Sequence, residues 1–259
     1  MKVIAVANQK GGVGKTTTAV NLGASLAILE KKVLIVDMDP QGNATSYVGV
    51  DPEVARENNV YRSLIGDRPL KDLVVKTSFP NLSIVPAGPD LAGAEVELVD
   101  LERRETRLRA RLYEFPLDAD VVFIDCPPSL GLLTINALSA AHSVIVPLQC
   151  EYLAMEGLGR ILETIEMVRS SLNPSLDVEG VLLTMFDGRN NLSHQVEEEL
   201  RKHLGSIVFD TVIPRNVRIS ESPSFGRPVL MYAYSSRGAV KYLELAEELL
   251  EKWQKRKQD

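Results

Sequence analysis

The stretch NQKGGVGKTT at residues 8–17 decides which fold the chain must adopt. Its end, GKT at 14–16, fits the phosphate-binding loop G-x-x-x-x-G-K-[ST], in which glycines free backbone N–H groups to surround phosphates and the lysine reaches the outer ones. Its start departs from that pattern, because Gln9 stands where glycine is wanted and a second lysine, Lys10, follows. The loop therefore predicts a nucleotide site that carries one more cation than the pattern needs.

The loop lies between a strand-like run, KVIAVAN at 2–8, and a helical pattern at 15–29. This context turns the short motif into a phosphate site, because the N-terminus of a helix attracts anions. Lys15 is expected to neutralise the β- and γ-phosphates, and the hydroxyl of Thr16 to bind Mg²⁺. The residues of this loop expected to contact the nucleotide are Lys10, Gly11, Gly12, Val13, Gly14, Lys15, Thr16 and Thr17.

Short β-branched runs alternate with helical patterns along the chain. Such alternation predicts an α/β fold of the P-loop NTPase type, with a mostly parallel, twisted sheet of about seven to eight strands and helices on both faces. Residues 51–80 are more polar and predict a surface excursion. The expected strands lie at 2–8, 32–37, 82–87, 120–125, 143–148, 178–185 and 206–213, and the expected helices at 15–29, 95–113, 132–141, 156–172 and 193–204.

Length and composition favour one nucleotide-binding domain over residues 1–259, without a linker. The terminal stretch carries apolar residues at helical spacing, so we expect a helix at about 239–256 that packs on the core. Two cysteines are too few for a disulfide scaffold, and the N-terminus has no signal-peptide architecture, which indicates the cytoplasm. Residues 126–150 are uncharged, but prolines and polar residues interrupt them, so no membrane helix is expected.

Carboxylates follow two of the predicted strands. Asp125 ends VVFID in the manner of a Walker B motif, where it can hold a metal-bound water. Asp37 and Asp39 lie two residues apart in VLIVDMDPQGN; Asp39 could orient the attacking water, and Asp37 could support the metal shell or a moving loop. The expected metal set is therefore Thr16, Asp37 and Asp125.

Charge is distributed unevenly along the chain. The net charge of −6 by itself argues against a nucleic-acid partner, because a polyanion is repelled by a negative body. Residues 201–237, however, contain six Arg or Lys and two acids, a local charge of +4, so the remainder of the chain carries −10. A local basic patch can therefore meet DNA.

The phosphate-binding loop and the two stretches that carry the carboxylates together resemble the deviant Walker A ATPases, whose signature is K-G-G-x-G-K-[ST]. Within that group, five stretches resemble the ParA/Soj chromosome and plasmid partition ATPases. The resemblance covers residue 2 to about residue 250 and implies that the single domain is a deviant Walker A ATPase. The chain begins at its first strand, so we expect a short form without an N-terminal DNA-binding extension. The stretches are NQKGGVGKTT, VDMDPQGNAT, DCPPSLGLLTINAL, QCEYLAMEGL and VIPRNVRISESPSFGRPV.

The resemblance implies a purpose for Lys10. In that family the corresponding lysine crosses a nucleotide sandwich dimer and contacts the phosphates of the partner subunit, a cation in trans comparable to an arginine finger, which is worth about 10³–10⁵ in rate. Gly11 would let the two loops face each other closely. The resemblance also implies Mg²⁺ and ATP, with adenine flanked by the loop around Pro214 and Asn216. The expected catalytic residues are Lys10, Lys15, Asp39 and Asp125.

The resemblance further implies partners and a location. We expect an ATP-dependent homodimer that binds non-specific double-stranded DNA, a ParB-type centromere-binding protein as the trigger of hydrolysis, and a nucleoid-associated protein in the cytoplasm. Arg218 and Arg189 match DNA-contacting arginines of the family, and their weaker neighbours are Arg201, Lys202 and Arg215.

Three alternatives stay open. The nitrogenase iron protein shares the loop and holds an iron–sulfur cluster with two cysteines per subunit, but Cys126 and Cys150 are interpreted as small core residues. A MinD-type membrane-cycling ATPase needs an unburied apolar face on its C-terminal helix, and a nucleotide-binding scaffold would lack turnover. The basic tail is a weak signal for anionic lipid: Lys252, Lys255, Arg256 and Lys257.

Overall fold

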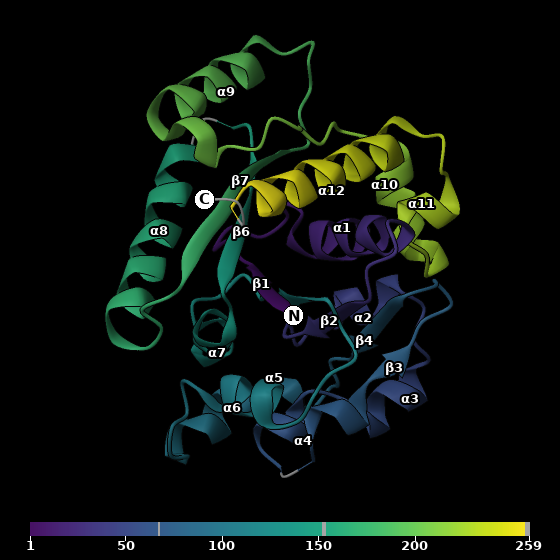
Figure 1. Ribbon diagram of the computed structural model, residues 1–259, viewed down its shortest axis with the longest axis vertical. Coiled ribbons are helices and arrows are strands. Elements are labelled where there is room, and N and C mark those ends of the chain that lie inside the picture. The colour runs from purple at the N-terminus through teal and green to yellow at the C-terminus, as the bar shows by residue number, and fades with distance from the viewer. Residues whose placement is uncertain (67, 152–153, 257–259) are drawn as a thin grey trace.

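The computed structural model describes residues 1–66, 68–151 and 154–256. Tyr152 and Leu153 of the QCEYLAMEGL motif and Lys257 of the basic tail lie outside the described residues. Within the described residues, one seven-stranded sheet with the order β3-β4-β2-β5-β1-β6-β7 crosses the molecule (Figure 1), and only β3 runs antiparallel to its neighbour. This sheet confirms the predicted P-loop NTPase fold. The strands are β1 (Lys2–Val6), β2 (Val33–Asp37), β3 (Val75–Lys76), β4 (Leu82–Val85), β5 (Val121–Asp125), β6 (Ser143–Gln149) and β7 (Asp177–Thr184).

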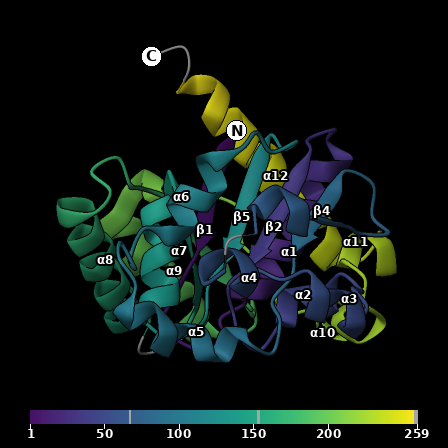
Figure 2. The same ribbon diagram turned by 90° about the horizontal axis from the view of Figure 1, so that it is seen from below.

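Helices cover both faces of the sheet. Alternate residues of one strand enter different cores, because Ile4 and Val6 pack with α1 and α12 whereas Val3 and Ala5 pack with α4 to α8. In Figure 2, the view from below, α4, α5 and α6 lie in front of the strands. The helices are α1 (Lys15–Ile28), α2 (Asn43–Tyr47), α3 (Pro52–Glu57), α4 (Tyr61–Leu64), α5 (Leu91–Glu97), α6 (Arg107–Glu114), α7 (Leu132–Ala140), α8 (Ala154–Ser171), α9 (Asn191–Leu204), α10 (Val217–Glu221), α11 (Val229–Tyr232) and α12 (Arg237–Lys255).

The strand predicted at 206–213 is wrong. A 3-10 turn occupies Gly205–Ile207, and the following residues form only isolated bridges to the β7 region, at Val208 and Pro214. The amides of residues 209 and 213 donate to the β7 carbonyls of residues 181 and 183. Between them side chains satisfy the backbone: the Glu248 carboxylate accepts from the amides of residues 210 and 211 at 2.9 Å each, and Arg201 donates to the carbonyls of residues 209 and 210. Side-chain contacts thus interrupt the regular ladder that β-propensity favoured.

The helix predicted at 95–113 is also wrong, since it is divided into α5, a 3-10 turn at Leu98–Asp100 and α6. Arg103 takes a left-handed φ of 53° in the break. Asn136 of α7 fixes the break, because its amide donates to the Arg104 carbonyl at 2.6 Å and its carbonyl accepts from the Leu108 amide at 3.0 Å. The polar excursion at 51–80 contains α3, α4 and the edge strand β3.

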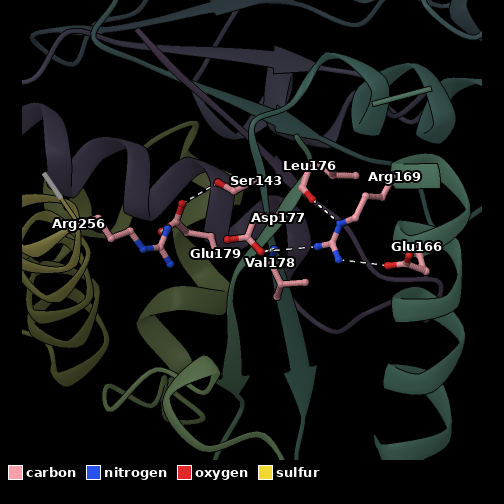
Figure 3. Close-up of polar contacts among 8 residues, drawn as sticks. All are labelled: Ser143, Glu166, Arg169, Leu176, Asp177, Val178, Glu179 and Arg256. Carbon is pink, nitrogen blue, oxygen red and sulfur yellow. Dashed lines mark hydrogen bonds and ion pairs between the residues drawn. The ribbon is translucent and has the colours of Figure 1, made fainter. Parts of the chain in front are cut away.

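The C-terminal helix α12 lies beside α1 in Figure 1. Its end is tied to the sheet, because Glu179 of β7 accepts from Arg256 Nη1 at 3.0 Å and from Trp253 Nε1 at 3.2 Å. Figure 3 shows Arg256 and Ser143 meeting this carboxylate from opposite sides. The apolar stripe of α12 is buried and consists of Ala239, Tyr242, Leu245, Ala246, Leu249 and Trp253.

Candidate nucleotide-binding and hydrolysis site

The loop between β1 and α1 has a backbone that only glycine adopts easily. Gly12 and Gly14 have φ angles of 75° and 91°, in the left-handed region. Gly14 is the N-cap of α1, and the Thr18 amide donates to its carbonyl at 2.8 Å. The helix therefore begins inside the loop and directs its free N–H groups toward the space where a phosphate would lie.

Two neighbouring strands hold this loop in place. The Asn8 side chain donates to the Pro147 carbonyl of β6 at 2.7 Å and accepts from the Lys10 amide at 3.0 Å. Thr184, the last residue of β7, donates its hydroxyl to the Val13 carbonyl at 2.8 Å. Sequence reasoning missed both anchors, although each is a polar residue where a buried apolar strand ends.

The two lysines of the loop have different surroundings. Lys15 is buried and donates to the Lys10 carbonyl at 3.2 Å. Burial lowers the pKa of Lys15, and the nearby carboxylates of Asp125 and Asp39 oppose this shift. The Lys10 side chain is 45% exposed and forms an ion pair with Glu151, which follows β6. The ammonium group of Lys15 is thus bound within the loop, whereas the ammonium group of Lys10 is bound by a residue outside the loop.

Asp37 and Asp125 are register partners at the carboxyl ends of adjacent strands β2 and β5. Asp37 accepts from the Thr45 hydroxyl at 2.7 Å, the Thr45 amide at 2.9 Å and the Asp39 amide at 3.2 Å. Burial raises the pKa of Asp37 to about 6, although these hydrogen bonds lower it. Of the two expected roles, support of the loop is the one that these contacts serve. Asp39 is buried beside it and accepts from the Gln41 amide at 3.0 Å.

Asp125 has 0% exposure, and neither of its carboxylate oxygens has a hydrogen-bond partner among the residues that the structure describes. Burial raises its pKa well above the ordinary value, and the charge of Asp37 adds to that rise. Thr16 and Lys15 lie close enough to oppose the shift, but Thr16 does not reach hydrogen-bonding geometry. A buried carboxylate without a partner costs stability, so its retention fits a role in holding a water or a metal ion beside Thr16 and Lys15.

Among the described residues no group of three or more His, Cys, Asp or Glu side chains could hold a metal. A magnesium ion still fits here, because it keeps several waters and takes other ligands from phosphates.

The phosphate-binding loop and residues that follow β2, β5 and β7 line a cavity of about 500 Å³, within the usual range for ligand sites, whereas Lys10, Asp37 and Asp125 are not among its lining residues. A larger cavity, of about 770 Å³, lies along α6 and contains none of the predicted site residues. Pro214 and Asn216 do not line the 500 Å³ cavity: Asn216 caps α10, and Met185 and Pro223 take the lining positions. The full lining is Gly11, Gly12, Gly14, Lys15, Thr16, Thr17, Asp39, Gln41, Asn43, Ser46, Tyr47, Pro128, Met185 and Pro223.

Met185 combines a lining position with a left-handed φ of 50°, which is uncommon for a side chain of its size. Sequence reasoning missed it, because nothing in VLLTM marks a strained backbone. The cysteines lie inside the protein: Cys126 and Cys150 are buried and free, and burial raises the pKa of Cys150 to about 12. This placement is typical of core residues.

The two predicted DNA-contacting arginines are exposed: Arg189 lies on the loop after β7, and Arg218 lies on the short helix α10. Arg189 is 90% exposed and donates two parallel hydrogen bonds to Asp187, each 3.0 Å long. Arg189 lowers the pKa of Asp187 to about 2. Arg218 pairs with Glu221 at 2.8 Å on α10. The Arg215 amide donates to the Phe186 carbonyl at 3.0 Å, so the segments carrying these three arginines meet at the end of β7.

Arg201 and Lys202 lie at the other end of α9. Arg201 pairs with Glu197 at 3.0 Å and donates to two backbone carbonyls of the next segment, which gives its guanidinium a structural task. Lys202 is exposed.

Known proteins resemble the whole chain. A family model described as an AAA domain matches residues 1–178. The chain is 54% identical over 248 residues to the sporulation initiation inhibitor protein Soj of Bacillus subtilis (strain 168), covering 96% of this chain and 98% of that protein. It is 53% identical over 251 residues to the chromosome partitioning protein ParA of Myxococcus xanthus (strain DK1622), covering 97% and 88%. A solved cobyrinic acid a,c-diamide synthase from Mycobacterium smegmatis with bound ADP and magnesium has a TM-score of 0.85 at 42% identity, covering 98% and 96%.

Proposed function

Because the chain belongs to the ParA/Soj family of partition ATPases, we propose that it dimerises with ATP, binds non-specific DNA in that state, and hydrolyses ATP to drive segregation of a chromosome or plasmid. A ParB-type centromere-binding protein would trigger the hydrolysis, and the protein would act in the cytoplasm on the nucleoid. The main support for this proposal is the position of Lys10. This additional cation of the loop is exposed and does not line the 500 Å³ cavity of its own subunit.

The site residues divide the hydrolysis among them. Lys15 would move from the Lys10 carbonyl to the outer phosphates, and the α1 amides would bind them in place. Magnesium would neutralise phosphate charge, held by the Thr16 hydroxyl and by a water on Asp125. Asp39, at the cavity wall, would orient the attacking water. Lys10 of a second subunit would add positive charge where the transferring phosphoryl group needs it.

Gly11 supports a face-to-face dimer. An added Cβ at Gly11 would meet nothing within 4 Å, and its φ is not left-handed, so no contact within the subunit requires glycine there. Leu130 and Met155 are exposed apolar side chains on segments that follow β5 and β6, whose carboxyl ends adjoin the loop. A second subunit, approaching closely over the loop, accounts for both features.

Arg189 and Arg218 would bind DNA phosphates. Exposed ion pairs contribute only about 0–1 kcal/mol, so a phosphate can replace Asp187 or Glu221 at low cost. Neutralising Z phosphates on B-DNA gives a salt slope of about −0.9Z, and a closed dimer doubles Z. ATP should therefore switch on DNA binding that is steeply salt-dependent and indifferent to sequence.

DNA binding across a salt series, with ATP and with ADP, tests the proposal. Arg218→Glu should lose DNA retention but keep ATP-dependent dimerisation. Arg160→Glu is the matched control, because Arg160 forms a similar exposed pair with Glu156 on α8. Equal DNA binding of the wild type with ATP and ADP, or an Arg218→Glu protein that binds like the wild type, would contradict the proposal.

The C-terminal helix bears on the MinD-type alternative. Among the described residues, no helix is both long and apolar enough to cross a membrane. The apolar face of α12, including Leu245 and Leu249, is buried on the core, so it is not free to enter a lipid surface. Flotation of the ATP-bound protein with anionic liposomes would favour the alternative.

A further inference from the structure

Glu151 is bound to the one residue that distinguishes this phosphate-binding loop. Its carboxylate forms an ion pair with Lys10 Nζ, and both side chains are about half exposed, at 46% and 45%. Glu151 itself is held in a tight turn between β6 and α8, because its amide donates to the Gln149 carbonyl at 2.8 Å and its carbonyl accepts from the Ala154 amide at 2.9 Å. The acid thus has a defined place beside the loop.

We propose that Glu151 is a positioning residue, which holds Lys10 on its own subunit until the phosphates of the partner subunit replace it. The inference rests on the proposed trans role of Lys10. One ammonium group cannot stay on Glu151 and also reach across the interface, so the two acceptors compete. The pair consequently opposes dimerisation and keeps the trans cation away from the subunit's own nucleotide.

Nucleotide binding can loosen this arrangement through Lys15. In the structure the Lys15 ammonium donates to the Lys10 carbonyl at 3.2 Å, and the Lys10 amide donates to Asn8. When Lys15 turns to the phosphates, the Lys10 carbonyl loses that donor. The backbone that carries Lys10 is then held from one side only, by Asn8, whose amide is bound to Pro147 of β6.

Because the dimer is two-fold symmetric, the free-energy cost of breaking the Lys10–Glu151 pair counts twice in the dimer dissociation constant. An exposed ion pair changes an equilibrium constant by up to about fivefold. A two-fold dimer breaks two such pairs, so removal of the acid should lower the dimer dissociation constant by up to about 25-fold. The pair is solvent-exposed, so added salt should shrink the difference between wild type and variant.

The test compares Glu151→Gln with the wild type at saturating ATP and magnesium, by sedimentation and by ATPase activity as a function of protein concentration. The variant should dimerise at about 2- to 25-fold lower concentration and reach half-maximal specific activity at correspondingly lower concentration. Its kcat at saturation should stay unchanged, because Glu151 touches no phosphate. Glu156→Gln is the matched control, since it breaks the Glu156–Arg160 pair in the first turn of α8.

The Lys10→Ala background provides a second measurement. With no ammonium to hold, Glu151→Gln should change neither dimerisation nor nucleotide affinity in that background. A wild type that stays monomeric with ATP would contradict the proposed dimer itself. A wild type that dimerises, together with a Glu151→Gln dimer of equal or weaker affinity, would overturn only the role of Glu151.

Discussion

Two buried carboxylates, one near the amino ends and one at the carboxyl ends of the parallel strands, differ in whether the protein gives them hydrogen-bond donors. Glu179, near the start of β7, is 2% exposed and accepts hydrogen bonds from Ser143 at 2.6 Å, Arg256 at 3.0 Å and Trp253 at 3.2 Å. Asp125, at the end of β5, is 0% exposed and accepts no hydrogen bond from the described part of the chain. Glu179 links β7 to β6 and to the end of α12, whereas Asp125 has lone pairs that a bound water or metal ion could use.

The difference shows where the fold tolerates strain. At the amino edge, buried charge is paired, as the theory of buried ions requires. At the carboxyl edge, the left-handed Met185 and the buried Lys15 line one cavity, and Asp125, which has no hydrogen-bond partner among the described residues, lies buried close to Lys15. Unfavourable features that gather at one site indicate function, because elsewhere they would only destabilise the protein.

The largest expected effect concerns Asp125. Asp125→Asn should lower ATP turnover by about 10³-fold, since the oxygen that orients the metal shell is lost. The same change should raise the stability of the nucleotide-free protein at pH 8 by about 1 kcal/mol, because no buried charge remains there. Steady-state ATPase assays and urea unfolding measure both. Asp118→Asn, at an exposed pair with Lys32, should change neither. A destabilised Asp125→Asn protein would contradict the comparison.

Glu179 should show the opposite behaviour. Glu179→Ala should lower the free energy of unfolding by about 3 kcal/mol, because three donors lose one buried acceptor. The ATP affinity of the remaining folded protein should stay the same, since Glu179 is at the other end of the sheet. Urea unfolding and nucleotide titration test this pair of outcomes, and a loss of ATP affinity without loss of stability would refute it.

Asp37 should give the stability a pH dependence. Its pKa of about 6 in the folded protein is above the ordinary 3.8, so the folded state holds this proton more tightly than the unfolded state. The stability that the tighter proton binding provides is fully present below pH 3.8 and is lost as the pH rises through 6. Between pH 4 and 7 the wild type should therefore lose up to about 3 kcal/mol relative to Asp37→Asn. Unfolding curves of both proteins at several pH values provide the measurement, and parallel pH profiles would show that Asp37 is not shifted.

The smallest effect should come from Thr184. Thr184→Val removes the 2.8 Å hydrogen bond to Val13 at nearly constant volume and should cost about 1 kcal/mol of stability, with a severalfold loss of ATP affinity because the loop is less fixed. Thr164→Val is the control, since its hydroxyl bonds to Arg160 within α8. Equal nucleotide affinities of the two variants would show that β7 does not hold the loop.

Most strands of the fold could be predicted from the local pattern of apolar residues along the chain. Six of the seven strands in the described residues lie in apolar runs that could be recognised from the sequence. A strand that is buried on both faces consists almost entirely of apolar residues, so its position is visible without the structure. The exceptions depended on distant partners. The stretch 206–213 has strand-like residues, but Glu248 and Arg201 bind its middle and interrupt its pairing with β7. Asn136 fixes the break that divides the predicted helix at 95–113.

The sequence by itself determined the nucleotide loop, the carboxylates at the strand ends and the additional lysine, because each follows from residue types at fixed spacing beside a strand. Only the tertiary structure decided which of these groups have partners. Glu151 lies 141 positions from Lys10. Asp37 holds Thr45, whereas Asp125 is left without a donor, and Met185 rather than Asn216 lines the cavity. The physical reason is that pairing and burial depend on which residues the parallel crossovers bring together, and spacing along the chain does not encode those distances.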